Sequence, residues 1–405
     1  MSARVSPQHK TEVRLWPVAG VQERIKQLEH MLSGSVGPTE QGRVLSILRQ
    51  ASDGDFNTIL SRIDLVRLNA FMREDSLALS NDLAYFKLLS ETRLGAMSVA
   101  TKALWVDALQ RVYTDAPAER AIAAVFLGTQ GQGLTELKNR VDAGDDQYDL
   151  QELVHHDIDN KNLRRQMLTH IAGQATLPVG ASVKILSDVD DTVFSSIHDE
   201  RVAKGTTYPG IVAFYRALAR PPGEGRSNLT FLSARPRDPL GVVENYTKHR
   251  LRQKNMPEHA LLTGDVFHWL GHAHQAKKKI ENFVQYQALF PEYGFIFFGD
   301  SGQGDPIVAR TLLEKHVKHM VAAFIHDLGN LSRHDVRQLE EQGVICFKNY
   351  VAAAIVAYDR GLISRQAVLD VAKSAEQAST EAFDPAYTTL LRQDIDRART
   401  LAAAA

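Results

Sequence analysis

Three carboxylates, Asp188, Asp190 and Asp191, follow the apolar run Val183–Leu186 within a few positions of the sequence. The run predicts a buried strand, and unpaired carboxylates beside a strand end are costly to remove from water. A hard cation such as Mg2+ would offset that cost, because it binds carboxylate oxygens. In an extended chain Asp188 and Asp190 point the same way, so one could attack a phosphorus atom while the other moves a proton. The alternative is an acidic turn, in which Asp bonds its own backbone.

Polar side chains of matching chemistry follow three later segments. Ser233 comes directly after the apolar run LTFL, and the lysines Lys277–Lys279 open a predicted helix. Asp300 and Asp305 lie in the glycine-rich stretch GDSGQGD that follows FIFF. Each set alone is weak evidence, since a serine after a strand is usually a turn residue and a lysine run is usually a solvated face. Their order, each at a strand or helix end, predicts one site.

Phosphoryl transfer would use all of these residues. It needs a nucleophile in line, a cation across the oxygens and fixed donors for the remaining charge. Asp188 would be the nucleophile and form an aspartyl phosphate, and Asp190 would be the general acid and base. The expected Mg2+ ligands are Asp188, Asp300 and the backbone carbonyl of Asp190, while Asp305 is a further ligand or orients a metal-bound water. Ser233 would donate to a phosphate oxygen, and a lysine would neutralise its charge.

These segments also resemble a known superfamily. The run from Asp188 to Thr192 (DVDDT) is similar to the DxDx(T/V) motif of the haloacid dehalogenase superfamily. Ser233, a lysine and GDSGQGD are similar to its second, third and fourth motifs, in that order. More closely, SDVDDTV, FLSARP and FFGDSGQGDP resemble the phosphatidate phosphatase family named for its association with yeast actin patches. The similarity covers roughly Val183 to Gly329.

The resemblance implies a Mg2+-dependent enzyme that dephosphorylates phosphatidate to diacylglycerol. For the third motif, the family's lysine lies one helix before a Phe-Pro pair. Lys279 has the matching distance to Phe290-Pro291, and Lys278 is the alternative. The residues that the resemblance predicts as catalytic are Asp188, Asp190, Thr192, Ser233 and Lys279, and the predicted metal ligands are Asp188, Asp190, Asp300 and Asp305.

The elements that position these residues change character along the chain. We expect a disordered segment at 1–14, a helical domain of unknown role at 15–175, an α/β catalytic domain at 183–330 and a helical extension at 331–405. In the third segment short apolar runs alternate with helices, which predicts a parallel sheet with helices on both faces and ligands beyond the carboxyl ends of its strands. The predicted strands are Val183–Leu186, Leu229–Leu232, Ala260–Leu262, Phe295–Phe298 and Val321–Ile325, with VICF as an extra strand.

The resemblance extends this prediction to a Rossmannoid fold of the haloacid dehalogenase type. Its members that act on small molecules generally carry cap domains, inserted after the first motif or between the second and third. Here the segments 194–229 and 236–276 hold only the expected helices, loops and a strand. A nearly capless, open site suits a large substrate, such as a lipid head group at a membrane or a phosphorylated macromolecule.

Composition excludes some classes of protein. The chain has 405 residues with 47 basic and 48 acidic side chains, so no global field attracts nucleic acid. Its one cysteine allows no internal disulfide, which fits a reducing compartment. The N-terminus lacks the apolar core of a signal peptide, and no run approaches the roughly 20 apolar residues of a membrane span. We therefore expect a cytoplasmic protein with a peripheral membrane contact as an option.

Two alternatives remain beside a lipid phosphatase. The motifs recognise only a phosphoryl group, so a phosphoprotein or nucleotide phosphatase would use the same residues. A phosphatidate-binding module without catalysis would keep the fold and lose its catalytic carboxylates. Asp188 and Asp190 are both present, which argues against the second alternative. Protein partners, regulation and oligomeric state have no signal in the sequence.

Overall fold

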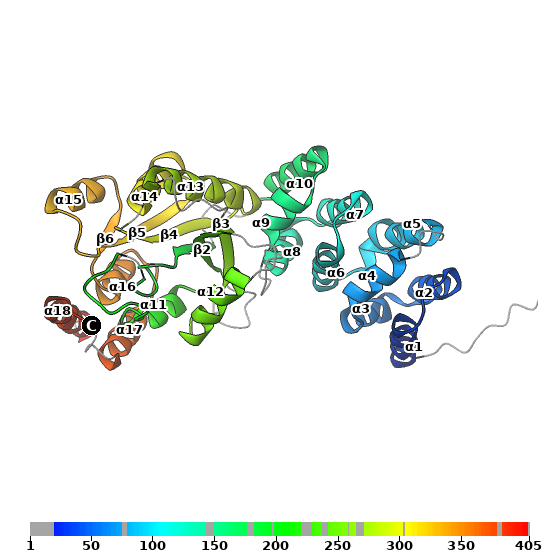
Figure 1. Ribbon diagram of the computed structural model, residues 1–405, viewed down its shortest axis with the longest axis horizontal. Coiled ribbons are helices and arrows are strands. Elements are labelled where there is room, and N and C mark those ends of the chain that lie inside the picture. The colour runs from blue at the N-terminus through cyan, green and yellow to red at the C-terminus, as the bar shows by residue number, and fades with distance from the viewer. Residues whose placement is uncertain are drawn as a thin grey trace, which may run out of the picture. The chain divides into compact units, whose positions relative to one another are not determined.

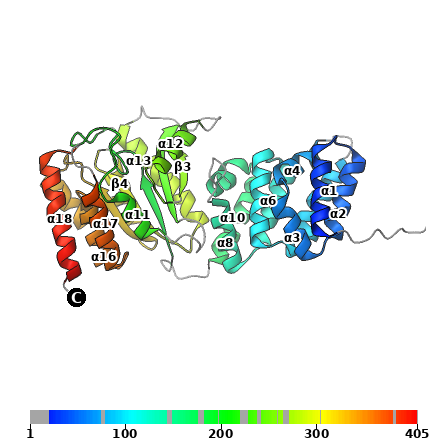
Figure 2. The same ribbon diagram turned by 90° about the horizontal axis from the view of Figure 1, so that it is seen from below.

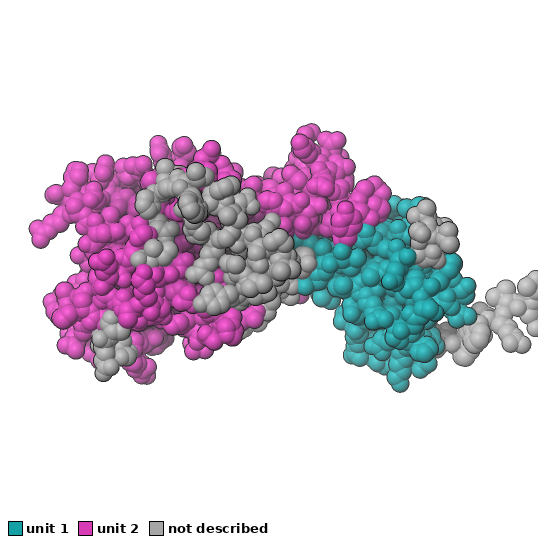
Figure 3. Space-filling view, viewed as in Figure 1, with its two compact units in different colours: residues 1–112 teal, residues 113–405 magenta. Residues whose placement is uncertain are grey.

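The computed structural model divides the chain into two compact units, Met1–Val112 and Tyr113–Ala405 (Figure 3). The predicted disordered segment 1–14 and most of the linker 175–182 fall outside the described residues. The structure describes residues 20–74, 79–142, 149–175, 182–196, 198–219, 228–236, 242–257, 259–264, 271–302, 304–378 and 383–403.

The first unit is helical, as the sequence predicts. Tyr85 and Trp105 are fully buried in its core, and their polar atoms both donate to Asn69 Oδ1, at 2.6 and 3.3 Å. The elements are α1 (Val21–Ser33), α2 (Pro38–Gln50), α3 (Asp53–Arg62), α4 (Leu65–Arg73), α5 (Leu79–Lys87), the π-helical turn η2 (Leu88–Thr92), the 3-10 turn η3 (Leu94–Ala96) and α6 (Val99–Val112).

The second unit contains a sheet of six parallel strands in the order β3-β2-β1-β4-β5-β6. The strands are β1 (Val183–Asp188), β2 (Leu229–Pro236), β3 (Ala260–Gly264), β4 (Gly294–Asp300), β5 (Met320–His326) and β6 (Ile345–Phe347). The parallel α/β sheet predicted from the sequence is confirmed. In its register Asp188 pairs with Leu232 of β2, and Ser187 pairs with Phe298 of β4. The predicted site residues Asp188, Ser233 and Asp300, which lie in the carboxyl-terminal parts of these three strands, therefore share one edge of the sheet.

Helices cover both faces of this sheet (Figures 1 and 2). Tyr215 of α11 packs against Phe298 and against Tyr350 of α16 on one face, whereas Tyr286 of α13 packs against Phe295 on the other. The helices of this unit are α7 (Ala116–Leu127), α8 (Gly131–Asp142), α9 (Leu150–Glu152), the π-helical turn η4 (Leu153–Asp157), α10 (Lys161–Gln174), α11 (Ile211–Leu218), α12 (Val242–Gln253), α13 (Gly271–Leu289), α14 (Asp305–Lys315), α15 (Arg333–Glu341), α16 (Tyr350–Asp359), α17 (Arg365–Gln377) and α18 (Pro385–Ala403).

Two buried ion pairs join α8 to strand β1 and to the turn that precedes β4. Lys138 Nζ lies 2.7 Å from Glu292 Oε1, and both side chains are 2% exposed. Lys184, inside the apolar run of β1, donates to Asp142 Oδ2 at 2.9 Å and to the Tyr286 hydroxyl at 3.0 Å. Helix α8 thus packs with the sheet, although the sequence groups it with the N-terminal helices. Packing alone does not show which segments fold independently, so the predicted domain boundaries stay predictions.

The segment after β5 adds a strand and helices, which confirms the predicted helical tail. Helices α16, α17 and α18 supply apolar side chains to the core that they share with the sheet, among them Val351, Val371 and Leu391. Within the described part of the chain, none of the helices has both the length and the apolar character that crossing a bilayer requires. The predicted near absence of a cap stays a prediction, because parts of both intervals that it concerns lie outside the described residues.

Candidate active site

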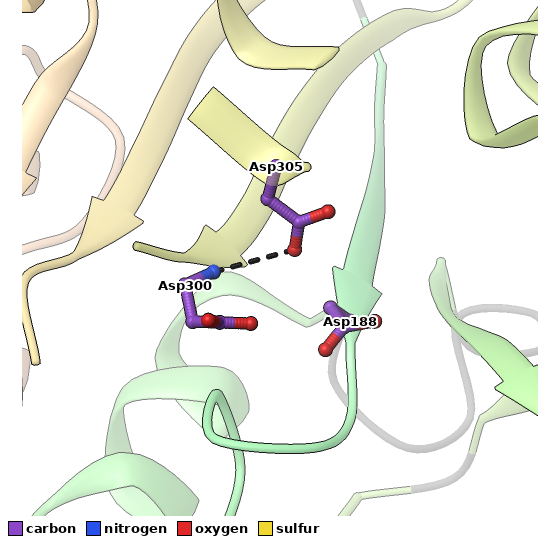
Figure 4. A group of neighbouring side chains, drawn as sticks. All are labelled: Asp188, Asp300 and Asp305. Carbon is purple, nitrogen blue, oxygen red and sulfur yellow. Dashed lines mark hydrogen bonds between the residues drawn. The ribbon is translucent and has the colours of Figure 1, made fainter. Parts of the chain in front are cut away.

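Three carboxylates from distant parts of the sequence face one another at the carboxyl edge of the sheet (Figure 4). Asp188 ends β1, Asp300 ends β4 and Asp305 begins α14. Each offers a carboxylate oxygen, and these atoms all lie within 4.8 Å of one another. All three residues are buried. Strands β1 and β4 are parallel neighbours and end side by side. This arrangement brings the residues of the first and fourth predicted motifs together.

Lys279 of α13 completes this cluster. Its Nζ lies 2.7 Å from Asp188 Oδ1 and 2.6 Å from Asp305 Oδ1, and the residue is buried. Lys278 instead pairs with Glu281 at 3.1 Å, and its side chain is 45% exposed. The structure therefore places Lys279, and not the alternative Lys278, among the predicted site residues.

The loop after β1 turns sharply because Asp191 adopts a left-handed conformation with a φ of 57°. Asp tolerates this conformation better than most residues. Its carboxylate accepts hydrogen bonds from the backbone N–H groups of Ser196 and His198, both at 2.7 Å, and its own N–H donates to Phe194 O at 2.9 Å. Asp191 is thus a structural residue of the loop, whereas the sequence shows it only as one of three acidic neighbours.

Asp190 and Thr192 lie in the same loop. Asp190 is half-buried, and its side chain is not part of the group formed by Asp188, Asp300 and Asp305. Its negative charge nevertheless contributes to raising the pKa of Asp188, which places it near the cluster. The Thr192 hydroxyl is buried and has no hydrogen-bond partner among the described atoms. Its role and the proton-transfer role of Asp190 stay predictions.

Gly299 allows Asp305 to reach the cluster. A Cβ added to Gly299 would lie 2.4 Å from Asp305 Oδ2 and 2.5 Å from Asp305 Cβ, which is shorter than real contacts. The loop then holds both carboxylates, since Asp300 N donates to Asp305 Oδ2 at 3.3 Å and Gly302 N donates to Asp300 Oδ1 at 2.6 Å. In the sequence, the one signal for the role of Gly299 is its place directly before Asp300.

Burial and like charges perturb the acids of the cluster. Burial raises the pKa of Asp188 to about 8 against the attraction of Lys279, and the charges of Asp305 and Asp190 add to the rise. Burial raises the pKa of Asp300 well above its usual range, together with the charges of Asp305 and Asp188. Burial lowers the pKa of Lys279, but Asp188 and Asp305 outweigh it and raise that pKa. The amine therefore stays protonated, and the two raised carboxyl pKa values mean that ionising Asp188 and Asp300 together needs a further positive charge nearby.

The donor set fits a hard divalent cation. Asp188 Oδ2 and Asp300 Oδ2 are buried and have no hydrogen-bond partner among the described atoms. Leaving such oxygens unpaired is costly, and carboxylate oxygens are the ligands that hard cations take. Lys279 contacts two of the three carboxylates, Asp188 and Asp305, so a divalent ion would balance the charge that remains when all three are ionised. The cluster is a candidate metal centre.

Ser233 lies in β2 beside this edge. Its backbone pairs with Thr263 of β3, next to the register shift that follows in β2. Its side chain lies outside the described residues, so the predicted contact with a phosphate oxygen stays a prediction.

One comparison with known proteins identifies the segment that carries the cluster. Residues 183–327 match the family model described as phosphatidate phosphatase APP1, catalytic domain. Neither the curated proteins nor the solved structures gave a match. The matched segment contains Asp188, Lys279, Asp300 and Asp305, and it suggests a hydrolase of the phosphatidate phosphatase type. This agrees with the family resemblance of the motifs, while membership of the haloacid dehalogenase superfamily stays a prediction.

Proposed function

We propose that the protein is a Mg2+-dependent phosphatase that cleaves a phosphomonoester through an aspartyl phosphate, and that phosphatidate is its substrate. The observation that carries the proposal is the contact of Lys279 with Asp188 inside a buried carboxylate cluster, within the segment that matches the phosphatidate phosphatase model. The position of the cluster at the carboxyl edge of a parallel sheet also supports a fold of the haloacid dehalogenase type.

Asp188 would act as the nucleophile. Lys279 holds one oxygen of this carboxylate, and the other, Oδ2, has no hydrogen-bond partner among the described atoms. That second oxygen would form a bond to phosphorus while the bond between phosphorus and the ester oxygen breaks. Asp190 would protonate the departing ester oxygen. It would then take a proton from a water molecule that attacks the phosphorus, which releases phosphate and regenerates Asp188.

The metal would be held by Asp188, Asp300 and the backbone carbonyl of Asp190. When bound, Mg2+ would supply positive charge that polarises the phosphoryl group and reduces its repulsion from the carboxylates. Both oxygens of Asp305 already accept hydrogen bonds, from Lys279 and from Asp300 N. Asp305 would therefore mainly orient Lys279 and serve as a further ligand.

The experiment is phosphate release from phosphatidate in mixed micelles, with and without Mg2+, for the wild type and Asp188→Asn. Asp359→Asn, at an exposed helix end, is the matched control. We expect release by the wild type and by Asp359→Asn with Mg2+, and none by Asp188→Asn. Full Mg2+-dependent release by Asp188→Asn would overturn the proposed mechanism.

A soluble phosphomonoester, p-nitrophenyl phosphate, separates the remaining hypotheses. Release from this ester alone would favour a phosphoprotein or nucleotide phosphatase that uses the same residues. If the protein releases phosphate from neither substrate but still binds phosphatidate vesicles, the result would favour a binding module without catalysis. Binding to phosphatidate vesicles also tests the proposed peripheral membrane contact of a cytoplasmic protein.

A further inference from the structure

Two buried tyrosines lie behind the loop that follows β1. The Tyr350 hydroxyl donates to the backbone carbonyl of Thr192 at 2.6 Å. The Tyr215 hydroxyl lies 2.6 Å from Ser187 Oγ, which in turn donates to the backbone carbonyl of Asp188 at 2.7 Å. Both tyrosines are fully buried, and their rings pack against each other with centroids 6.2 Å apart.

These contacts form two short paths of hydrogen bonds, one to each end of the segment 188–192. Each hydroxyl has one proton to donate. Ser187 and Tyr350 give theirs to the carbonyls of Asp188 and Thr192, so Tyr215 gives its proton to Ser187 Oγ. The two tyrosines therefore support both ends of the segment, which contains the predicted nucleophile and general acid.

The position of Tyr350 is itself fixed from the C-terminal extension. The preceding residue, Asn349, caps α16 by accepting hydrogen bonds from the N–H groups of Val351 and Ala352. Its amide donates to Asp394 of α18 at 2.8 Å, in a buried contact. The Tyr350 ring also packs against Phe347, with centroids 5.1 Å apart. All of these residues lie beyond residue 327, where the family match ends.

We propose that Tyr350, together with Tyr215, is a positioning residue that holds the loop 188–192 in its reactive shape, and that the C-terminal extension thereby completes the active site. The proposal rests on the proposed phosphatase function. The two hydroxyls fix the ends of a short segment, so they set the spacing between Asp188 and Asp190. A displacement of about 1 Å at reacting groups can cost about 100-fold in rate, which makes this support relevant to turnover.

The test removes single hydroxyls. Tyr350→Phe, Tyr215→Phe and the double variant are compared with Tyr286→Phe. The Tyr286 hydroxyl is equally buried and donates to Asp142 at 2.6 Å, but it lies on the other face of the sheet and does not contact the loop. This control loses the same group from a buried network of the same unit, so general loss of stability affects both sets of variants.

We expect Tyr350→Phe to lower kcat for phosphatidate by about 10- to 100-fold, with KM within about three-fold of the wild type. The double variant should lose less than the product of the two single losses, because both hydroxyls hold the same short loop. Tyr286→Phe should keep kcat within about two-fold. Equal losses of kcat in Tyr350→Phe and Tyr286→Phe would overturn the proposal.

Amide hydrogen exchange provides a readout that does not need turnover. In Tyr350→Phe the amides of residues 189–196 should exchange at least about ten-fold faster than in Tyr286→Phe, because the loop has lost its support. Unchanged exchange would overturn the proposal whatever the activity. If the wild type shows no phosphatase activity, the proposed function fails, and exchange alone then decides whether the tyrosines hold the loop.

Discussion

Lys279 Nζ lies 2.6 Å from Asp305 Oδ1, and the same amine lies 2.7 Å from Asp188 Oδ1. One buried cation thus links the end of β1 to the start of α14. Removing a lysine and a carboxylate from water is costly, and such a pair often stabilises a protein less than apolar residues would. The arrangement is better explained by function, since it directs one oxygen of Asp188 and leaves the other available.

The first prediction separates the two lysines. Lys279→Met should reduce Mg2+-dependent phosphate release by at least about 100-fold, because it removes the buried charge that holds Asp188. Lys278→Met should keep at least about half of the activity, since Lys278 only contacts Glu281 near the surface. Both are measured as kcat/KM for phosphatidate. The reverse order of the two effects would assign the role to Lys278.

The second prediction concerns Gly299. Gly299→Ala should displace Asp305, because the new Cβ would meet its side chain at 2.4 to 2.7 Å. We expect a loss of about 1–3 kcal/mol in the free energy of unfolding and a strong loss of activity. Gly173→Ala is the control, since an added Cβ there has nothing within 4 Å. Normal activity in Gly299→Ala would show that the position of Asp305 does not matter for turnover.

The third prediction is a pH dependence of stability caused by His326. Burial lowers its pKa to about 4, and the charge of Arg201 adds to this effect. The imidazole is therefore neutral in the folded protein and donates from Nδ1 to the Asp191 carbonyl at 3.0 Å. The unfolded chain binds a proton near pH 6.5, so this contribution to stability is present above pH 6.5 and is lost as the pH falls towards 4.

Urea unfolding at a series of pH values measures this contribution. Between pH 7 and pH 4 the wild type should lose about 3 kcal/mol more than His326→Gln, which cannot titrate. Comparing the wild type with His326→Gln cancels the pH-dependent contributions of the other acids and histidines to stability. Parallel curves for the two proteins would mean that the pKa of His326 is the same in the folded and the unfolded chain.

The fourth prediction concerns the buried pair of Lys138 and Glu292. Lys138→Met should lower the free energy of unfolding by about 3–5 kcal/mol, because it leaves the charge of Glu292 buried and unpaired. Lys138→Met combined with Glu292→Gln should recover most of this loss. Arg399→Met, which breaks an exposed contact with Glu376, should cost only a small fraction of it. A double variant as unstable as the single one would contradict the account.

Much of the fold could be predicted because apolar runs are local signals. The run Val183–Leu186 predicts β1, yet the strand continues to Asp188. The reason is that backbone pairing does not depend on side-chain polarity, and Ser187 and Asp188 still pair with Phe231 and Leu232. The order of the strands has no comparable local signal in the sequence.

The candidate site could be predicted in part, because its motifs are short and lie at strand ends. Tyr215 and Tyr350 could not be found in this way. They lie in apolar helices, and their contacts with the loop span 28 and 158 positions of sequence. Likewise, the sequence indicates Lys184 only as part of a buried strand. Its ion pair with Asp142 has no local signal, because Asp142 comes from a distant helix.

The measurement that tests the central claim most directly is covalent labelling of Asp188. Phosphatidate that carries radioactive phosphorus in its head group is mixed with Mg2+ and the enzyme, and the reaction is stopped with acid during turnover. We predict a protein-bound label that hydroxylamine removes, as expected of an acyl phosphate, and no label on folded Asp188→Asn. Rapid phosphate release without any label on the wild type, together with equal release by Asp188→Asn, would contradict the account.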